Sequence, residues 1–217
     1  MSAPRQVEFR REALPPLTAL EHEWRGLEAV GRTSFFTSWH WIGTLLATVP
    51  PAHRPELLRG TVRGETVALA LLGANNNRRR YGLVRSRSLH LNETGDARFD
   101  SLTIEHNGLL AASEFEPVIL ESLTAWFADR CDEADELYFA GSQLRLPESA
   151  IEGSGLLRRE IIVPSFSVDL CRLEQNGRQI FSILSANTRQ QLRRAFRHYE
   201  QFGPLQLREA DSGFSLR

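Results

Sequence analysis

Three arginines stand four residues apart in the segment that begins at Ser185 and ends at Gly203. Residues at this spacing lie on one face of a helix, so we predict that Arg189, Arg193 and Arg197 present their guanidinium groups together. Guanidinium groups bind phosphates and carboxylates through paired hydrogen bonds. The three arginines could therefore hold a phosphate-bearing acceptor, an acidic polysaccharide precursor or a nucleic-acid backbone. A solvated basic face is the alternative, and the spacing alone favours it.

A second group of polar side chains lies in the middle of the chain, around two predicted strand ends. Carboxylates and side-chain amides can recognise an amine or a sugar hydroxyl through directed hydrogen bonds. The same residue types also bind their own main chain in turns, and composition alone favours that role. The candidate residues for binding an acceptor are Asn92, Glu93, Asp96, Asp100, Glu105 and Asn107.

Residue types exclude or disfavour several kinds of chemistry. All 26 basic residues are arginine, which removes lysine Schiff bases, lysine general bases and lysine phosphate cradles. Cys131 and Cys171 lack the spacing of a metal-binding pair, and His90 and His106 show no metal-ligand spacing either. We therefore predict no metal site.

An aromatic cluster could stack on a sugar ring or a base. It consists of Phe35, Phe36, Trp39 and Trp41. Trp39 falls on the apolar stripe of a predicted helix, which favours packing in the core. Trp41 lies off that stripe, so its role stays open.

Strands and helices that would position these residues follow from periodicity and from turn residues. Hydrophobic residues at helical spacing, bounded by prolines and glycine, predict two helices near the amino terminus. The unbroken apolar run at residues 67–72 predicts a central strand covered on both faces. In order, we predict an edge strand at 6–10, helices at 17–30 and 39–49 with Thr37 or Ser38 as the second cap, and strands at 56–62 and 66–72.

Three asparagines and three arginines at residues 75–80 interrupt this pattern, and we predict an exposed loop there. The predicted elements beyond it are strands at 83–91 and 99–105, a helix at 113–130, a strand at 136–140, a short helix at 147–152, and strands at 156–163 and 166–170. This order indicates an α/β fold, α+β by a stricter definition: a mixed sheet with helices on both faces.

A further unit begins after residue 170. We predict a short helix at 178–184, then the arginine helix with Thr188 and Gln191 as a capping box, and a strand at 205–209. Gly203 and Pro204 end the arginine helix. Its other face carries the hydrophobic residues Leu192, Phe196, Tyr199 and Phe202.

Composition is that of a folded protein, with 41% hydrophobic and 24% charged residues. The net charge of -1 disfavours a broad electrostatic hold on nucleic acid. The amino terminus is too polar for a signal peptide, and the longest apolar run is too short to span a bilayer. We therefore expect a cytoplasmic protein with no membrane span.

The order of predicted elements resembles that of a GNAT acyltransferase domain. Three segments are similar to bacterial tandem-GNAT acyltransferases of the CelD/BcsL and FemAB-like group: FFTSWHWIGTLL, LHLNETGDARFDSLTIEHNGLLA and SANTRQQLRRAFRHYEQFGPLQLREA. The resemblance implies an amino-terminal GNAT-like domain at residues 1–172 and the start of a second, incomplete one at 173–217. It also implies that Asn92, Glu93, Asp100, Glu105, Asn107 and the three arginines of the helix are candidate substrate-binding residues.

The function implied is transfer of an acyl group from acetyl-CoA or another acyl-CoA to an amine or hydroxyl. The acceptor would be a small molecule or glycan precursor of the cell envelope or of a polysaccharide. A non-catalytic module that holds phosphate-bearing ligands on the arginine helix is the alternative. The aromatic face of that helix would be covered if the helix folds back onto the first domain, if the chain forms a homo-oligomer, or if a carboxy-terminal half lies beyond this chain.

Acyl-CoA binding in such domains needs main-chain N–H groups that point at the pyrophosphate before a helix. The corresponding segment, IEHNGLLAASEF, contains a single glycine, Gly108, so the required tight turn is not encoded. We therefore predict that the first domain does not bind acyl-CoA tightly, and we expect the donor site to lie outside this chain. The residues do not indicate a catalytic base.

Overall fold

The computed structural model describes residues 6–101, 104–164, 167–175, 177 and 179–206. The chain divides into two compact units, Met1–Arg159 and Glu160–Arg217, which we describe separately. This division falls before the predicted domain boundary at residue 172. That the second unit begins a second GNAT-like domain stays a prediction.

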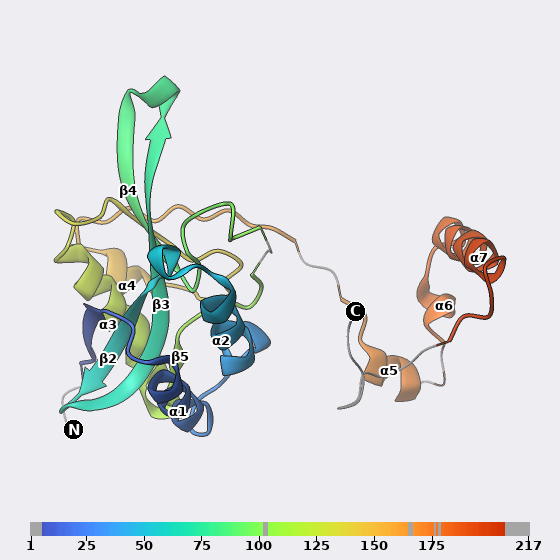
Figure 1. Cartoon of the computed structure of the whole chain (residues 1–217), viewed down its shortest axis with the longest axis horizontal. Helices are drawn as coiled ribbons and strands as arrows, with labels where there is room; N and C mark the ends of the chain where they lie inside the picture. Colours follow the sequence, from blue (N-terminus) through green and yellow to red (C-terminus); the bar gives the residue numbers. More distant parts are fainter. Residues whose placement is uncertain (1–5, 102–103, 165–166, 176, 178, 207–217) are drawn as a thin grey trace. The chain divides into compact units, whose positions relative to one another are not determined.

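A six-stranded mixed sheet forms the centre of the first unit, as far as its residues are described. Its strands are β1 (Glu8–Glu12), β2 (Glu56–Val62), β3 (Glu65–Arg79), β4 (Val84–Leu91), β5 (Leu110–Ala111) and β6 (Glu136–Tyr138). The order is β1-β2-β3-β4-β6, and β5 pairs with β3 (Figure 1). These strands pair antiparallel except β4 and β6, which are parallel. The first strand lies at the edge, as predicted.

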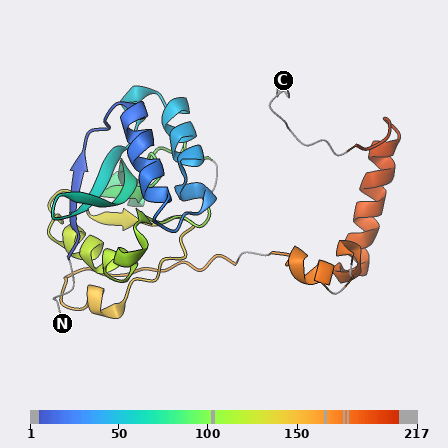
Figure 2. The ribbon, with the colours of Figure 1, turned by 90° about the horizontal axis from the view of Figure 1, so that it is seen from below.

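Helices cover both faces of the sheet, as Figure 2 shows. On one face, α1 (Leu17–Glu28) and α2 (Trp39–Thr48) pack against the sheet. On the other face, α3 (Glu116–Ala128) packs against it. From Ala68 to Leu72, successive side chains of β3 alternate between the two cores, because a strand projects its side chains to opposite faces. The prediction of a mixed α/β sheet with a central strand and helices on both faces is confirmed.

The aromatic cluster near α2 belongs mostly to the core. Trp39 is buried against Trp24, with ring centroids 6.2 Å apart. The Trp24 Nε1–H donates to the Thr37 carbonyl (2.9 Å). The half-buried Trp41 packs against Phe36, with centroids 4.8 Å apart. The predicted packing role of Trp39 is therefore confirmed, and Trp41 packs as well.

The start of α2 differs from the predicted cap. Ser38 stands at the cap position, but its hydroxyl donates to the Phe35 carbonyl and does not bind the first turn of α2. Instead, the Glu28 carboxylate accepts from the Trp39 N–H (2.7 Å). Ser34 and Thr37 cap a short 3₁₀-helix, Phe35–Thr37, that precedes α2.

The predicted exposed loop at residues 75–80 is wrong for most of its length. Strand β3 continues to Arg79 and pairs with β4, from Leu72 opposite Leu91 to Arg79 opposite Val84. Cross-strand hydrogen bonds offset the poor strand propensity of asparagine here. The Asn77 Nδ2 donates to the Ser88 Oγ (2.9 Å), and the turn is confined to Arg80–Gly82.

Three other predicted strands are wrong where the structure describes them. Residues 97–101 form turns and residues 104–105 form no strand, while 102–103 lie outside the described residues. Residues 156–163 and 167–169 have no strand partner among the described residues, and 165–166 are not described. Hydrophobic side chains alone do not make a strand without a neighbouring edge to pair with. The short strand β5 was not predicted, whereas α4 (Glu148–Ile151) was.

The described part of the second unit contains three helices: α5 (Leu170–Gln175), α6 (Ile180–Ile183) and α7 (Ala186–Glu200). The predicted arginine helix is α7, but its capping box is wrong. Ser185 is the cap, and its hydroxyl accepts from the Thr188 N–H (3.1 Å). No residue of α7 is buried, although Phe196 contacts Phe181 of α6. The strand predicted at 205–209 is absent at 205–206, and its remaining residues lie outside the described chain.

Candidate functional site

Strands β4 and β5 both pair antiparallel with β3, as two pieces of one strand. Between them the chain leaves the sheet, and we call this segment, residues 92–109, the excursion. Asn92, only 2% exposed, stands where it leaves. Its Oδ1 accepts from the Leu71 N–H (2.8 Å), and its Nδ2 donates to the Asn107 Oδ1 (2.9 Å) and the Gly108 carbonyl (2.7 Å). The Asn107 Nδ2 donates in turn to the Leu91 carbonyl (2.8 Å). These two amides fasten the ends of the excursion. That they also contact an acceptor stays a prediction.

Two glycines let the excursion lie close to the sheet. A Cβ at Gly73 of β3 would meet the Glu93 carbonyl oxygen at 2.3 Å and the Thr94 carbonyl carbon at 2.2 Å. A Cβ at Gly141 would meet the Ile104 carbonyl oxygen at 1.8 Å, and Gly141 also has a positive φ of 57°. Glycine inside a strand pattern often marks such an approach of main chain. It is the one sequence signal that could have located this contact.

Aspartates fix the first part of the excursion. The Asp100 Oδ1 accepts from both the N–H and the hydroxyl of Thr94, each at 2.9 Å. Asp96 binds the Arg98 side chain and accepts from the Arg98 N–H (3.0 Å). Glu105, by contrast, is exposed on the later part of the excursion. Asp96 and Asp100 therefore accept hydrogen bonds from the main chain of their own loop, which is the role that composition favours.

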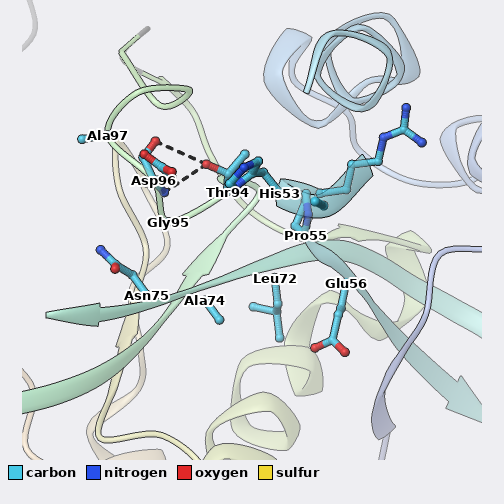
Figure 3. A pocket seen from close by; sticks show the side chains of 12 residues that line it. His53, Pro55, Glu56, Leu72, Ala74, Asn75, Thr94, Gly95, Asp96 and Ala97 are labelled. Atoms are coloured by element: carbon cyan, nitrogen blue, oxygen red, sulfur yellow. Dashed lines mark hydrogen bonds between the residues drawn. The ribbon is translucent and has the colours of Figure 1, made fainter. Parts of the chain in front are cut away.

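A cavity of about 440 Å³ lies between this loop, β3 and the segment that enters β2 (Figure 3). Thr94 and Asp96 form one wall, close to His53, and Asn75 and Glu56 come from the strands. Sequence reasoning did not select His53, Glu56 or Asn75. No local pattern could have selected them, because residues 52–56 and Asn75 come from two segments that meet each other, and the loop at 94–97, only in the folded chain. The cavity is lined by residues 52–56, Leu72, Ala74, Asn75 and residues 94–97.

Another row of polar side chains lies at the end of β4. His90 Nε2 lies 2.9 Å from Ser88 Oγ, and His90 Nδ1 lies 3.8 Å from a Glu93 carboxylate oxygen. The imidazole stacks on Tyr138 of β6, with centroids 4.9 Å apart. A hydroxyl, an imidazole and a carboxylate in a row resemble a nucleophile triad. Ser88 is only 1% exposed and accepts from Asn77, so its hydroxyl is not placed to attack a substrate.

The Asp96 carboxyl has a pKa lowered from 3.8 to about 2, chiefly by the hydrogen bond from the Arg98 side chain and then by the Arg98 N–H. We expect Arg98→Gln to raise this pKa towards the usual aspartate value, because the largest cause is removed. A lowered pKa means that ionised Asp96 supports the loop above about pH 4, and that this support is lost as the pH falls towards 2. An NMR titration of the Asp96 carboxyl carbon measures the shift.

Arg10→Gln is the matched control for this titration, since Arg10 lies on the edge strand β1. An Asp96 pKa that is the same in Arg98→Gln as in the parent chain would show that Arg98 does not hold the loop.

Several main-chain N–H groups before α3 already donate hydrogen bonds to carbonyls of the first unit. The Ala112 N–H donates to the Val67 carbonyl (2.9 Å), and the Ser113 N–H donates to the Val30 carbonyl (3.2 Å). The Phe115 N–H donates to the Ala112 carbonyl (2.9 Å). Glu114 and Glu116 add negative charge at the same place. An anionic pyrophosphate would find few donors and like charge there.

The arginines predicted to bind substrate lie in the second unit. The Arg189 Nη1 donates to the Leu184 carbonyl (2.7 Å), which ties α7 to the end of α6. The Arg197 Nε donates to the Arg193 carbonyl (3.2 Å) within α7. Arg193 and Arg197 are exposed, and Arg189 is half-buried. Their binding of a substrate stays a prediction.

Within the described ranges, no three His, Cys, Asp or Glu side chains come together in a group that could hold a metal ion. Within the same ranges, no helix has the length and hydropathy needed to cross a bilayer.

Comparisons with known proteins found one similar structure. No family model matches the sequence, and no curated protein matches it. A possible acetyltransferase from Clostridium difficile 630 is similar in structure, with a TM-score of 0.39 and 12% sequence identity. The match covers 75% of this chain and 98% of that protein. With so few identical residues, this similarity does not assign a function to the chain.

Proposed function

We propose that the first unit recognises the acceptor in an acyl-CoA-dependent N- or O-acyltransferase of the tandem-GNAT type. The acceptor is an amine or hydroxyl on a cell-envelope or polysaccharide precursor. One observation carries the proposal: the polar cavity is walled by the loop after β4, which is part of the segment that resembles this family. The mixed sheet with helices on both faces also supports a GNAT-like domain.

The chemistry of the cavity suits a ligand with hydroxyl or amino groups. Asp96 and Glu56 offer carboxylate oxygens, and Asn75 offers an amide. Arg98 and Arg11 already bind the two carboxylates, but each carboxylate has about four acceptor positions. Free acceptor capacity therefore remains for ligand hydroxyls or an ammonium group.

Acyl transfer needs attack by the acceptor on the thioester carbonyl and removal of a proton from the attacking group. His53 lines the cavity, on the connection between α2 and β2. We assign it as the side chain placed to take that proton. His90 is directed to Ser88 and Glu93 instead and does not line the cavity.

The acyl-CoA donor is proposed to bind outside this chain. Two observations support this. The N–H groups of Ala112, Ser113 and Phe115 already donate to carbonyls of the fold, and Glu114 and Glu116 place negative charge beside them. The amino-terminal end of a helix needs free N–H groups and a positive electrostatic potential to bind a pyrophosphate.

Calorimetry of the whole 217-residue chain with glucosamine and with N-acetylglucosamine tests the proposal. An acceptor site should bind the free amine at least about tenfold more tightly than the acylated product, because the product lacks the ammonium group. Asn75→Ala should weaken glucosamine binding roughly tenfold, the effect of one lost hydrogen bond to a charged or polar group. Asn76→Ala is the matched control, since this side chain projects from the opposite face of β3.

Equal affinity for the two sugars would contradict an amine acceptor at this site, and no binding of either sugar would contradict an acceptor site for amino sugars altogether. An equal loss in Asn75→Ala and Asn76→Ala would place the ligand outside the cavity.

A further inference from the structure

The paired strands β3 and β4 form a hairpin, residues 74–91, whose base packs in the core through Leu89 and Leu91 and whose outer part projects beyond the core (Figure 1). The turn at its tip is Arg80–Gly82. Residues 80, 81 and 82 all have positive φ angles, of 48°, 59° and 88°. A positive φ is strained for tyrosine, so the tight tip holds Tyr81 outward at a conformational cost.

The charge of the hairpin is entirely positive. Residues 74–91 include five arginines and no aspartate or glutamate, although the whole chain has a net charge of -1. Arg78 stands opposite Arg85, and Asn76 stands opposite Arg87, so these side chains share one face. On the other face, the two pairs that follow Arg79 and Val84 towards the core are neutral: Asn77 opposite Ser86 and Asn75 opposite Ser88. One face of the hairpin is therefore basic.

Arg78 and Arg85 lack a counter-charge within the described structure. Arg87 binds Asp135, but neither Arg78 nor Arg85 has an ion pair with a described residue. Like charges directly across a strand pair are destabilising. A face that keeps such a pair exposed is suited to an external anion.

Hydrophobic side chains cluster at the tip beside these arginines. Tyr81 is fully exposed, Leu83 is 86% exposed and Val84 is 45% exposed. Large hydrophobic residues exposed together next to basic residues are typical of surfaces that enter the boundary of a lipid bilayer. Tyrosine prefers the headgroup level, and arginine can reach lipid phosphates while its stem lies on hydrocarbon.

We propose that the tip of the β3–β4 hairpin binds an anionic membrane surface, with Arg78 and Arg85 on lipid phosphates and Tyr81 and Leu83 at the acyl boundary. Nucleic acid would also attract the arginines and could stack on Tyr81. A bound nucleic acid would leave Leu83 and Val84 in water. An anionic lipid surface therefore explains more of the exposed side chains at the tip. This inference does not depend on acyl transfer.

Sedimentation with vesicles tests the proposal. The whole chain should bind vesicles of phosphatidylcholine mixed with phosphatidylglycerol, should not bind phosphatidylcholine alone, and should dissociate as salt is raised. The double variant Arg78→Gln with Arg85→Gln should lower the partition coefficient about thirtyfold, because each arginine near an anionic surface contributes a factor of about five. Arg10→Gln with Arg32→Gln removes the same charge elsewhere in the first unit and should have much less effect.

Two further variants separate insertion from simple charge attraction. Leu83→Ser should also weaken vesicle binding, and Tyr81→Trp should give a new fluorescence signal that brominated lipids quench. Both positions are exposed, so these variants should melt like the parent chain.

No binding to anionic vesicles, or an equal loss in the Arg10 and Arg32 control, would overturn the proposal. Binding to a single-stranded RNA oligonucleotide without vesicle binding would overturn it in favour of nucleic acid. If brominated lipids failed to quench the added fluorescence of the Tyr81→Trp variant, insertion of the tip would be wrong.

Discussion

Asn92→Ala is expected to lower the free energy of unfolding of the first unit by roughly 3–5 kcal/mol, the largest effect of any polar substitution in the site. Asn92 is buried and makes three side-chain hydrogen bonds, which join β3 to both ends of the excursion. Alanine would leave the Leu71 N–H and the Gly108 carbonyl without these partners. It would also be strained at the positive φ of 54° that asparagine tolerates.

Urea unfolding followed by tryptophan fluorescence measures this change, because Trp24 lies in the core of the same unit. Asn76→Ala is the matched control and should change stability by less than about 0.5 kcal/mol, since this residue is exposed. A loss below about 1 kcal/mol for Asn92→Ala would show that the excursion is not fastened by this amide.

Gly73→Ala is expected to destabilise the first unit by roughly 2–4 kcal/mol and to weaken glucosamine binding. The added methyl group would overlap the main chain of Glu93 and Thr94, and main chain cannot rotate away as a flexible side chain can. The loop must therefore lift from β3, which displaces the wall formed by Thr94 and Asp96. Urea unfolding and the glucosamine titration measure the two effects.

Gly26→Ala provides the comparison for this variant. Gly26 lies inside α1 with open space around its Cβ position, so alanine should raise stability by up to about 1 kcal/mol. If Gly73→Ala unfolded at the same urea concentration as the parent chain, the close approach of the loop to β3 would be wrong.

Elements with a clear period could be predicted from the sequence. The helical spacing of Leu20, Trp24 and Leu27 located α1, and all three residues are buried. The apolar run of β3 located a central strand, because a strand covered on both faces needs hydrophobic residues at every position. The same logic located α2, α3 and α7. These patterns are local, so one sequence suffices to find them.

Pairings between distant segments could not be predicted. Asn75 and Asn77 have the composition of a loop, yet β4 supplies partners that hold them in a strand. The strands β4 and β5 share one neighbour, β3, with the excursion between them. Asn92 was predicted to bind an acceptor, whereas the structure shows that it holds the ends of this excursion. The cavity is still harder to predict from the sequence, because packing and not a sequence motif brings His53 and Asp96 together.

The central claim is that the first unit recognises an acceptor and leaves the acyl-CoA donor to be bound elsewhere. The most direct test is one calorimetric comparison on the 217-residue chain, with glucosamine in one titration and acetyl-CoA in the other. The account predicts heat of binding for glucosamine and none for acetyl-CoA at micromolar concentration. Low-micromolar binding of acetyl-CoA, or rapid release of free CoA when both ligands are present, would contradict it.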